Sequence, residues 1–176
     1  MASIDRASTT DSTDANARTS DLPISRPASL DHFDALIGTW EMEASFQTGY
    51  FGPDTPAITS RSGRTTFEWL EGKFFLTQRF VNDHPAAPSG IAIIGPSDEP
   101  NVFLQHYYDS RGVSRMYETS FDGRTWKVWR AAPGFSQRYT GRLSDDGARI
   151  DGAWEGSTDG EDWKHDFDLA YIRGNQ

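Results

Sequence analysis

Residues 36–46 read LIGTWEMEASF, and the spacing of apolar side chains changes within this segment. From Trp40 onward, apolar and polar residues alternate, which is typical of a β-strand with one buried face. The apolar positions are Trp40, Met42, Ala44 and Phe46. We therefore predict a first strand over residues 39–48.

Turn signals divide the chain after this strand into short segments. Glycine and aspartate tolerate the positive φ angles that tight hairpins need. Such residues recur at Glu71-Gly72, Ser110-Arg111-Gly112, Asp122-Gly123, Asp146-Gly147 and Asp159-Gly160. Around these turns we predict strands at 61–70, 73–82, 90–95, 101–109, 113–121, 124–131, 135–143, 148–157 and 162–173.

The predicted strands favour a closed barrel. No helical window long enough for a crossover connection interrupts them, so a parallel sheet is excluded and an antiparallel barrel or a sandwich remains. Closure hides the edges that about ten long strands would otherwise expose. We predict an all-β fold, a closed antiparallel up-and-down β-barrel of about ten strands with a short N-terminal helix.

The chain before the first strand has two predicted parts. Residues 1–28 contain mainly Ser, Thr, Asp, Arg and Ala, so burial cannot offset the entropy lost on ordering, and we predict a disordered tail. The barrel domain then covers residues 29–176 and opens with a helix that Ser29 can cap and Gly38 can end. Apolar residues recur in this helix at Leu30, Phe33, Leu36 and Ile37. We expect the helix to lie against the barrel mouth.

Composition excludes several classes of function. The 17 Lys and Arg residues against 26 Asp and Glu give a net charge of −9 without any basic cluster, which argues against nucleic acid as a partner. The chain has no cysteine, so disulfides, thiolate metal sites and thiol catalysis are excluded. Neither a signal-peptide pattern nor an apolar run of about 18 residues occurs, so we expect a cytoplasmic protein without membrane contact.

A tripeptide and a distant arginine carry a resemblance to a known superfamily. Gly38-Thr39-Trp40 resembles the Gly-x-Trp signature of the calycins, which include lipocalins and fatty-acid-binding proteins. In calycins a basic residue of the last strand packs across this tryptophan, and Arg173 is similarly placed. The resemblance implies a calycin-like barrel whose closed end is sealed by a guanidinium stacked on an indole.

Longer segments resemble a bacterial family known as domain of unknown function 1579. These segments are 36–40, 67–74, 144–147 with Trp154, 159–160 and 167–171, so the resemblance spans residues 30 to 174. That family implies the barrel but no established chemistry. Gly38-Thr39-Trp40-Glu41 and the C-terminal His165 also resemble nitrobindin, a haem-binding barrel of ten strands. This second resemblance implies haem held by His165 as an alternative; otherwise we expect no cofactor and no metal.

Alternation also predicts which side chains line the interior. The expected ligand-binding residues are His165, His106, Glu118, Gln137, Tyr108, Trp69, Phe167 and Tyr139. An aromatic lining with a few polar groups is typical of a small-molecule pocket. The longest loops, 49–56 and 83–89, are expected to cover this pocket from one end of the barrel.

Three functions follow from this predicted lining. The first is a binding protein that holds a small hydrophobic or aromatic molecule, oriented by His165 and His106. The second is the haem protein. The third is a cofactor-free isomerase, cyclase or lyase in which His106, Glu118 or His165 acts as acid or base. The sequence does not decide between binding and catalysis, and it leaves a homodimer open.

Overall fold

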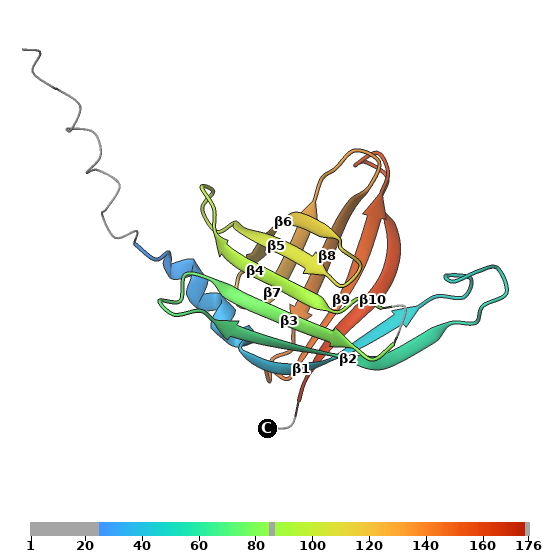
Figure 1. The fold of residues 1–176 in the computed structure, drawn as a ribbon, viewed down its shortest axis with the longest axis horizontal. Helices are drawn as coiled ribbons and strands as arrows, with labels where there is room; N and C mark the ends of the chain where they lie inside the picture. Colours follow the sequence, from blue (N-terminus) through green and yellow to red (C-terminus); the bar gives the residue numbers. More distant parts are fainter. Residues whose placement is uncertain (1–24, 85–86, 175–176) are drawn as a thin grey trace, which may run out of the picture.

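The computed structural model describes residues 25–84 and 87–174. Within these residues, ten antiparallel strands close into one barrel (Figure 1). The strands are β1 (Gly38–Phe46), β2 (Ile58–Trp69), β3 (Leu76–Asn82), β4 (Gly90–Pro96), β5 (Phe103–Asp109), β6 (Ser114–Phe121), β7 (Thr125–Arg130), β8 (Ser136–Leu143), β9 (Arg149–Ser157) and β10 (Lys164–Arg173). Each strand pairs with its neighbours in the sequence, and β1 pairs with β10 to complete the circle. The predicted fold class is confirmed, whereas almost all of the predicted tail lies outside the described residues.

One end of the barrel is closed by the residues of the calycin signature. The Arg173 guanidinium lies 4.1 Å above the Trp40 ring, which is fully buried. The same guanidinium donates hydrogen bonds to the backbone carbonyls of Ile37, Ala35 and Gly147, at 2.9, 2.7 and 3.1 Å. Since a charged group donates to three carbonyls, it ties the last strand to the end of the N-terminal helix, to the residue before β1 and to the β8–β9 turn.

A short helix, η1 (Ala28–Leu36), covers the same closed end. It is a 3₁₀-helix, and its three buried residues are Leu30, Phe33 and Leu36. Their spacing of three matches the three residues per turn of a 3₁₀-helix. Two expectations were wrong. Ser29 does not cap the helix. The helix lies at the closed end and not at the mouth, because the Leu36 carbonyl accepts a hydrogen bond from Trp40 Nε1 at 2.7 Å.

The interior is packed tightly only at this end. Most inward side chains of the closed half are buried, and those at most 2 % exposed include Phe67, Leu76, Ile94, Phe103, Trp126 and Ile150. The loops at the opposite end are those after β1, β3, β5, β7 and β9, and they include both long loops of the sequence (Figure 1). No described segment forms a helix that is long and apolar enough to cross a bilayer.

Candidate functional site

In strand β5 the inward and outward rows of side chains are exchanged relative to the prediction. Gln105 pairs with Tyr117 and is 6 % exposed, so the row of Phe103, Gln105, Tyr107 and Asp109 faces inward. His106 and Tyr108 therefore project from the outer face, where Tyr108 is 45 % exposed. The prediction that these two side chains line the interior is wrong, because both rows of β5 contain large residues and alternation alone could not select the buried row.

Strand β6 places Glu118 outside for the same geometric reason. Its neighbours Tyr117 and Thr119 are buried at 5 % and 0 % exposure, so the residue between them must point the other way. Glu118 pairs with Leu104 and Trp129 on the outer face. The predicted interior position of Glu118 is wrong.

A β-bulge moves His165 to the outer face of β10. His165 pairs with Glu155, but Phe167 pairs with the next residue back, Trp154, so Asp166 is an extra residue in this strand. One extra residue reverses the inward and outward alternation on either side of it. Phe167 points inward as predicted. His165 does not, and its Nε2 lies 2.8 Å from Asp168 Oδ1 while its Nδ1 lies 3.3 Å from Gln47 Nε2.

These positions do not fit haem held by an interior histidine. Among the described residues no imidazole points into the barrel: His106 and His165 are outside, His84 is in the exposed β3–β4 loop, and His32 bonds the Phe121 carbonyl at the closed end. The described residues also contain no cluster of three or more potential metal ligands. The proposed acid-base residues of an enzyme lie on the outer faces of β5, β6 and β10, so they do not meet inside the barrel.

The half of the barrel away from η1 is open to solvent. Its inward side chains, apart from that of Tyr117, are partly exposed, although they belong to the same rows as the buried residues of the closed half. We call this region the cup, and its inward residues are Tyr107, Arg115, Tyr117, Gln137, Trp154, Gly156, Phe167 and Leu169. Partial exposure of inward side chains means that water enters the barrel from this end. A barrel with more than eight strands is wide enough for such an opening.

Glycines on β9 show where the interior is filled and where it is empty. A Cβ at Gly152 would lie 2.4 Å from the Tyr139 hydroxyl, so the tyrosine ring occupies that position. At Gly156, two inward positions nearer the mouth, the nearest heavy atom would be the Ser136 carbonyl oxygen at 3.9 Å. Gly156 pairs with Gln137 and faces the same way. A small side chain at Gly156 would therefore overlap with no neighbouring atom, in contrast to one at Gly152.

Two of the predicted binding residues face inward but lie below the cup. Tyr139 is 1 % exposed, and its hydroxyl donates to the Leu169 carbonyl at 3.2 Å, so it forms part of the floor. Trp69 lies at the closed end, where its Nε1 donates to Asp34 of η1 at 2.6 Å. Sequence reasoning missed Arg115, Tyr107 and Tyr117, because these residues belong to rows that alternation did not assign to the interior.

Polar groups at the rim of the cup carry positive charge. Arg115 Nη1 donates to Gln137 Oε1 at 2.7 Å, and the Tyr117 hydroxyl donates to the same oxygen at 3.0 Å. Arg130, which pairs with Gln137 across β7 and β8, donates to the Phe135 carbonyl at 3.0 Å. Within the described part of the chain, neither arginine forms a salt bridge. The rim therefore offers two cations without acidic partners in a chain of net charge −9.

Asp109 anchors the β5–β6 turn beside the cup. Its side chain is 0 % exposed and accepts hydrogen bonds from the Tyr107 hydroxyl at 2.8 Å and from Arg111 Nη2 at 2.6 Å. Backbone N–H groups of Arg111 and Val113 donate to its other oxygen. Burial alone would raise the pKa of Asp109, but these donors together hold it well below its usual value. Burial and the Asp109 bond raise the pKa of Tyr107.

We expect Asp109→Asn to lower the free energy of unfolding by about 2 kcal/mol at pH 7. Because folding lowers the pKa of Asp109, its stabilisation is complete above the unfolded pKa of about 4 and is lost as the pH falls. Urea unfolding at pH 7 and pH 3 measures both effects, and the gap between wild type and variant should shrink at pH 3. Asp145→Asn, at an exposed turn, is the control. A gap that stays constant between the two pH values would contradict the assignment.

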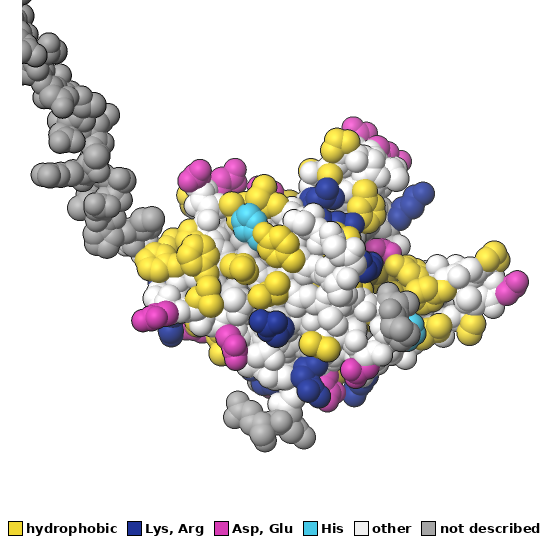
Figure 2. Space-filling view, in the orientation of Figure 1, with side chains coloured by type: hydrophobic (Ala, Val, Ile, Leu, Met, Phe, Trp, Pro, Cys, Tyr) yellow, Lys and Arg dark blue, Asp and Glu magenta, His cyan; other side chains and the backbone are white. Residues whose placement is uncertain are grey.

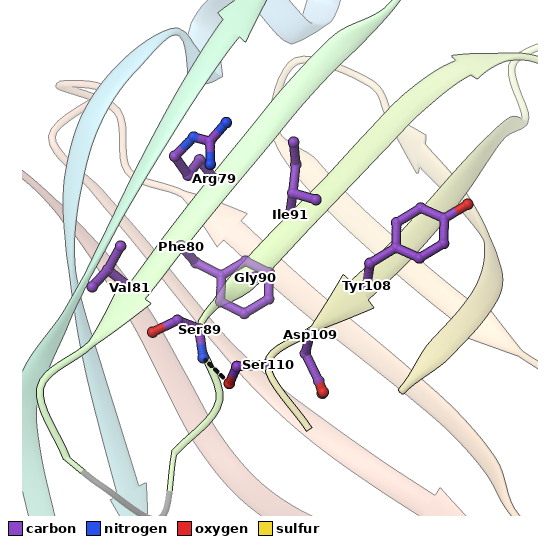
Figure 3. A pocket seen from close by; sticks show the side chains of 9 residues that line it. All are labelled: Arg79, Phe80, Val81, Ser89, Gly90, Ile91, Tyr108, Asp109 and Ser110. Atoms are coloured by element: carbon purple, nitrogen blue, oxygen red, sulfur yellow. Dashed lines mark hydrogen bonds between the residues drawn. The ribbon is translucent and has the colours of Figure 1, made fainter. Parts of the chain in front are cut away.

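Two surface hollows lie outside the cup. The first, of about 410 Å³, lies where β3, β4 and β5 reach the mouth (Figure 3), and Ser89 N donates to Ser110 Oγ at its edge, at 3.2 Å. Its lining residues are Arg79, Phe80, Val81, Ser89, Gly90, Ile91, Tyr108, Asp109 and Ser110. The second, of about 350 Å³, lies on β7, β8 and β9 beside Trp129, Arg138 and Glu155.

Apolar side chains also gather on the outer face of the barrel. Figure 2 shows them around an imidazole over β4–β6. His106 pairs there with Ile93 and with Met116, which is 56 % exposed. Scattered apolar side chains are common on protein surfaces, and this face contains no group of polar residues that converge on one point. We therefore take the cup as the candidate site.

Comparison with known proteins supports the fold. No protein-family model and no curated protein matches the sequence. Among solved structures, the chain is similar to the crystal structure of Rv2717c from M. tuberculosis, with a TM-score of 0.57 and 13 % identity over 86 % of this chain and 100 % of that one. An identity this low shows a shared barrel fold and nothing about function. The resemblances to domain of unknown function 1579 and to nitrobindin are not confirmed.

Proposed function

We propose that the protein binds a small, largely aromatic molecule in the cup, with an acidic group of that molecule at the rim. The observation that carries this proposal is the contrast between the two halves of the barrel. Most inward side chains are buried at the closed end, whereas those of the cup, apart from Tyr117, are partly exposed, and a Cβ at Gly156 would meet no atom closer than 3.9 Å. An open-ended apolar cavity with a few polar groups is what a small-molecule site requires.

Aromatic rings form the wall of the cup. The Tyr107 and Tyr117 ring centroids lie 6.2 Å apart, and those of Tyr117 and Trp154 lie 6.1 Å apart, both in edge-on arrangements. On the other side of the mouth, Phe46 and Phe167 stack at 5.2 Å. Such rings favour a flat ligand, because faces and edges of further rings pack against them at similar distances.

The arginines of the rim favour an anionic group on the ligand. Arg115 is partly buried, so its charge is less hydrated than that of a fully exposed arginine. Only Nη1 of this guanidinium has a described hydrogen bond to another side chain, which leaves donors for a carboxylate or sulfonate. Arg130 adds a second positive charge near Gln137. An anion bound at this point would be the acidic partner that the chain itself does not supply to these two arginines.

Filling the cup tests the proposal. We expect wild-type protein to bind anilinonaphthalene sulfonate, an aromatic anion whose fluorescence rises in apolar sites. Gly156→Phe should weaken this binding by at least about tenfold, since the new ring would occupy the space beside Gln137. A fluorescence titration measures both affinities.

The control for this experiment is Thr140→Phe, which adds the same ring on the exposed outer face of β8. It should leave the affinity unchanged. The proposal would be rejected by equal affinities of wild type and Gly156→Phe, or by a wild-type protein that does not bind the probe.

A further inference from the structure

We infer that the bound molecule carries a neutral N–H or O–H group at its buried end, and that Gln105 accepts a hydrogen bond from this group. The inference rests on the proposed function and adds the chemistry of the ligand's inner end to it. Together they define the ligand class as an aromatic acid with a neutral hydrogen-bond donor opposite its acidic group.

Gln105 is the polar side chain that points to such a donor. It faces inward on β5, between Ile94 of β4 and Tyr117 of β6, and is 6 % exposed. Within the described residues, its Oε1 is buried and has no hydrogen-bond partner. A buried carbonyl oxygen without a donor is costly, and such groups are rare in folded proteins. The position next in the row towards the mouth is Tyr107, which belongs to the cup.

The tyrosine and threonine hydroxyls near Gln105, and the Trp126 indole, already donate to other acceptors. The Tyr107 hydroxyl donates to Asp109 and the Tyr117 hydroxyl donates to Gln137. Deeper in the barrel, Trp126 Nε1 donates to Thr119, and the Thr119 hydroxyl donates to the Lys127 carbonyl. These donors could reach Gln105 only by giving up their present acceptors. A molecule that enters the cup could supply the donor that Gln105 lacks.

The surroundings of Gln105 also indicate that this donor is uncharged. Its neighbours in the same row are Phe103 and Tyr107, and the residues paired with it are Ile94 and Tyr117. None of these four side chains carries a charge. A cation at this depth would lose its hydration without gaining an ion pair, which is strongly unfavourable. A phenol, an amide or a ring N–H meets the requirement.

Two matched probes test the inference: 6-hydroxy-2-naphthoate, which has a donor opposite its carboxylate, and 6-methoxy-2-naphthoate, which has none. We expect wild-type protein to bind the hydroxyl compound about tenfold more tightly, the usual effect of one neutral hydrogen bond. Gln105→Leu should bring the two affinities together, because leucine is similar in size and accepts no hydrogen bond. Arg115→Met should weaken both probes while the ratio stays near tenfold.

The outcomes separate this inference from the proposed function. If wild-type protein binds both probes equally and Gly156→Phe blocks both, Gln105 holds only a water molecule, and the inference is overturned while binding in the cup stands. A tenfold preference that persists in Gln105→Leu also overturns it. If neither probe binds, both proposals fail. Should Gln105→Leu not fold, Gln105→Met replaces it, with the same expected loss of preference.

Discussion

Gly152→Ala is expected to lower the free energy of unfolding by about 3 kcal/mol, the upper range for overpacking a well-filled core. The new Cβ would lie 2.4 Å from the Tyr139 hydroxyl oxygen and 2.6 Å from the Thr140 carbonyl oxygen. The second of these atoms belongs to the backbone of a paired strand, so a rotamer change cannot relieve both contacts. Tyr139 would also lose its bond to the Leu169 carbonyl. Guanidinium unfolding followed by tryptophan fluorescence measures the change.

Gly156→Ala is the matched control, since it lies on the same strand and the same face. Its Cβ would meet nothing closer than 3.9 Å, so the change in stability should stay within about 0.5 kcal/mol. Similar losses at the two positions would show that the inner side of β9 is equally packed along its length. That result would also remove the free space on which binding in the cup depends.

The second large effect is expected for Arg173→Met, with a loss of about 4 kcal/mol in the free energy of unfolding. Methionine keeps much of the side-chain volume but removes three hydrogen bonds to carbonyls and the stacking on Trp40. Those carbonyls would then lack their donors at the closed end. Chemical denaturation measures the loss, and Trp40 should become more accessible to a fluorescence quencher.

Two further variants separate charge from geometry at this position. Arg173→Lys keeps the positive charge without the planar fork, so it should fall between wild type and methionine. Arg142→Met removes an exposed arginine from β8 and should change stability by no more than about 0.5 kcal/mol. An Arg173→Met variant as stable as Arg142→Met would contradict the sealing role of the guanidinium.

The closed half of the barrel could be predicted from the sequence because local patterns there agree with the fold. The alternation that begins at Trp40 places a row of apolar residues inside β1, and the observed strand begins one residue before the predicted one. The resemblance carried by Gly38, Trp40 and Arg173 implied the contact that closes this end. Each of these signals lies within one strand or in one pair of residues that are far apart in the sequence. It can therefore be recognised without knowing where the other strands lie.

The cup could not be predicted to the same extent, for two physical reasons. On β5 both faces carry large side chains, so hydrophobicity does not distinguish Gln105 from His106 as the inward residue. On β10 a single extra residue, Asp166, reverses the alternation, and an inserted residue in a strand leaves no signal in composition. The histidines predicted to line the interior therefore lie on the outer face. The inward positions of β5 and β6 are occupied instead by Arg115, Tyr107 and Tyr117.

If the protein binds a ligand as proposed, the division of the barrel into a packed end and an open end places the contacts for stability and those for ligand selectivity in different halves. Apart from Asp109, which anchors the β5–β6 turn, side chains around the mouth make few of the contacts that keep the strands together, so their substitution should affect folding little. Substitutions at the mouth can thus change ligand selectivity without first requiring other substitutions that raise the stability of the fold. The same property makes the scaffold suitable for laboratory evolution, in which the mouth is randomised while the sealed end is left untouched.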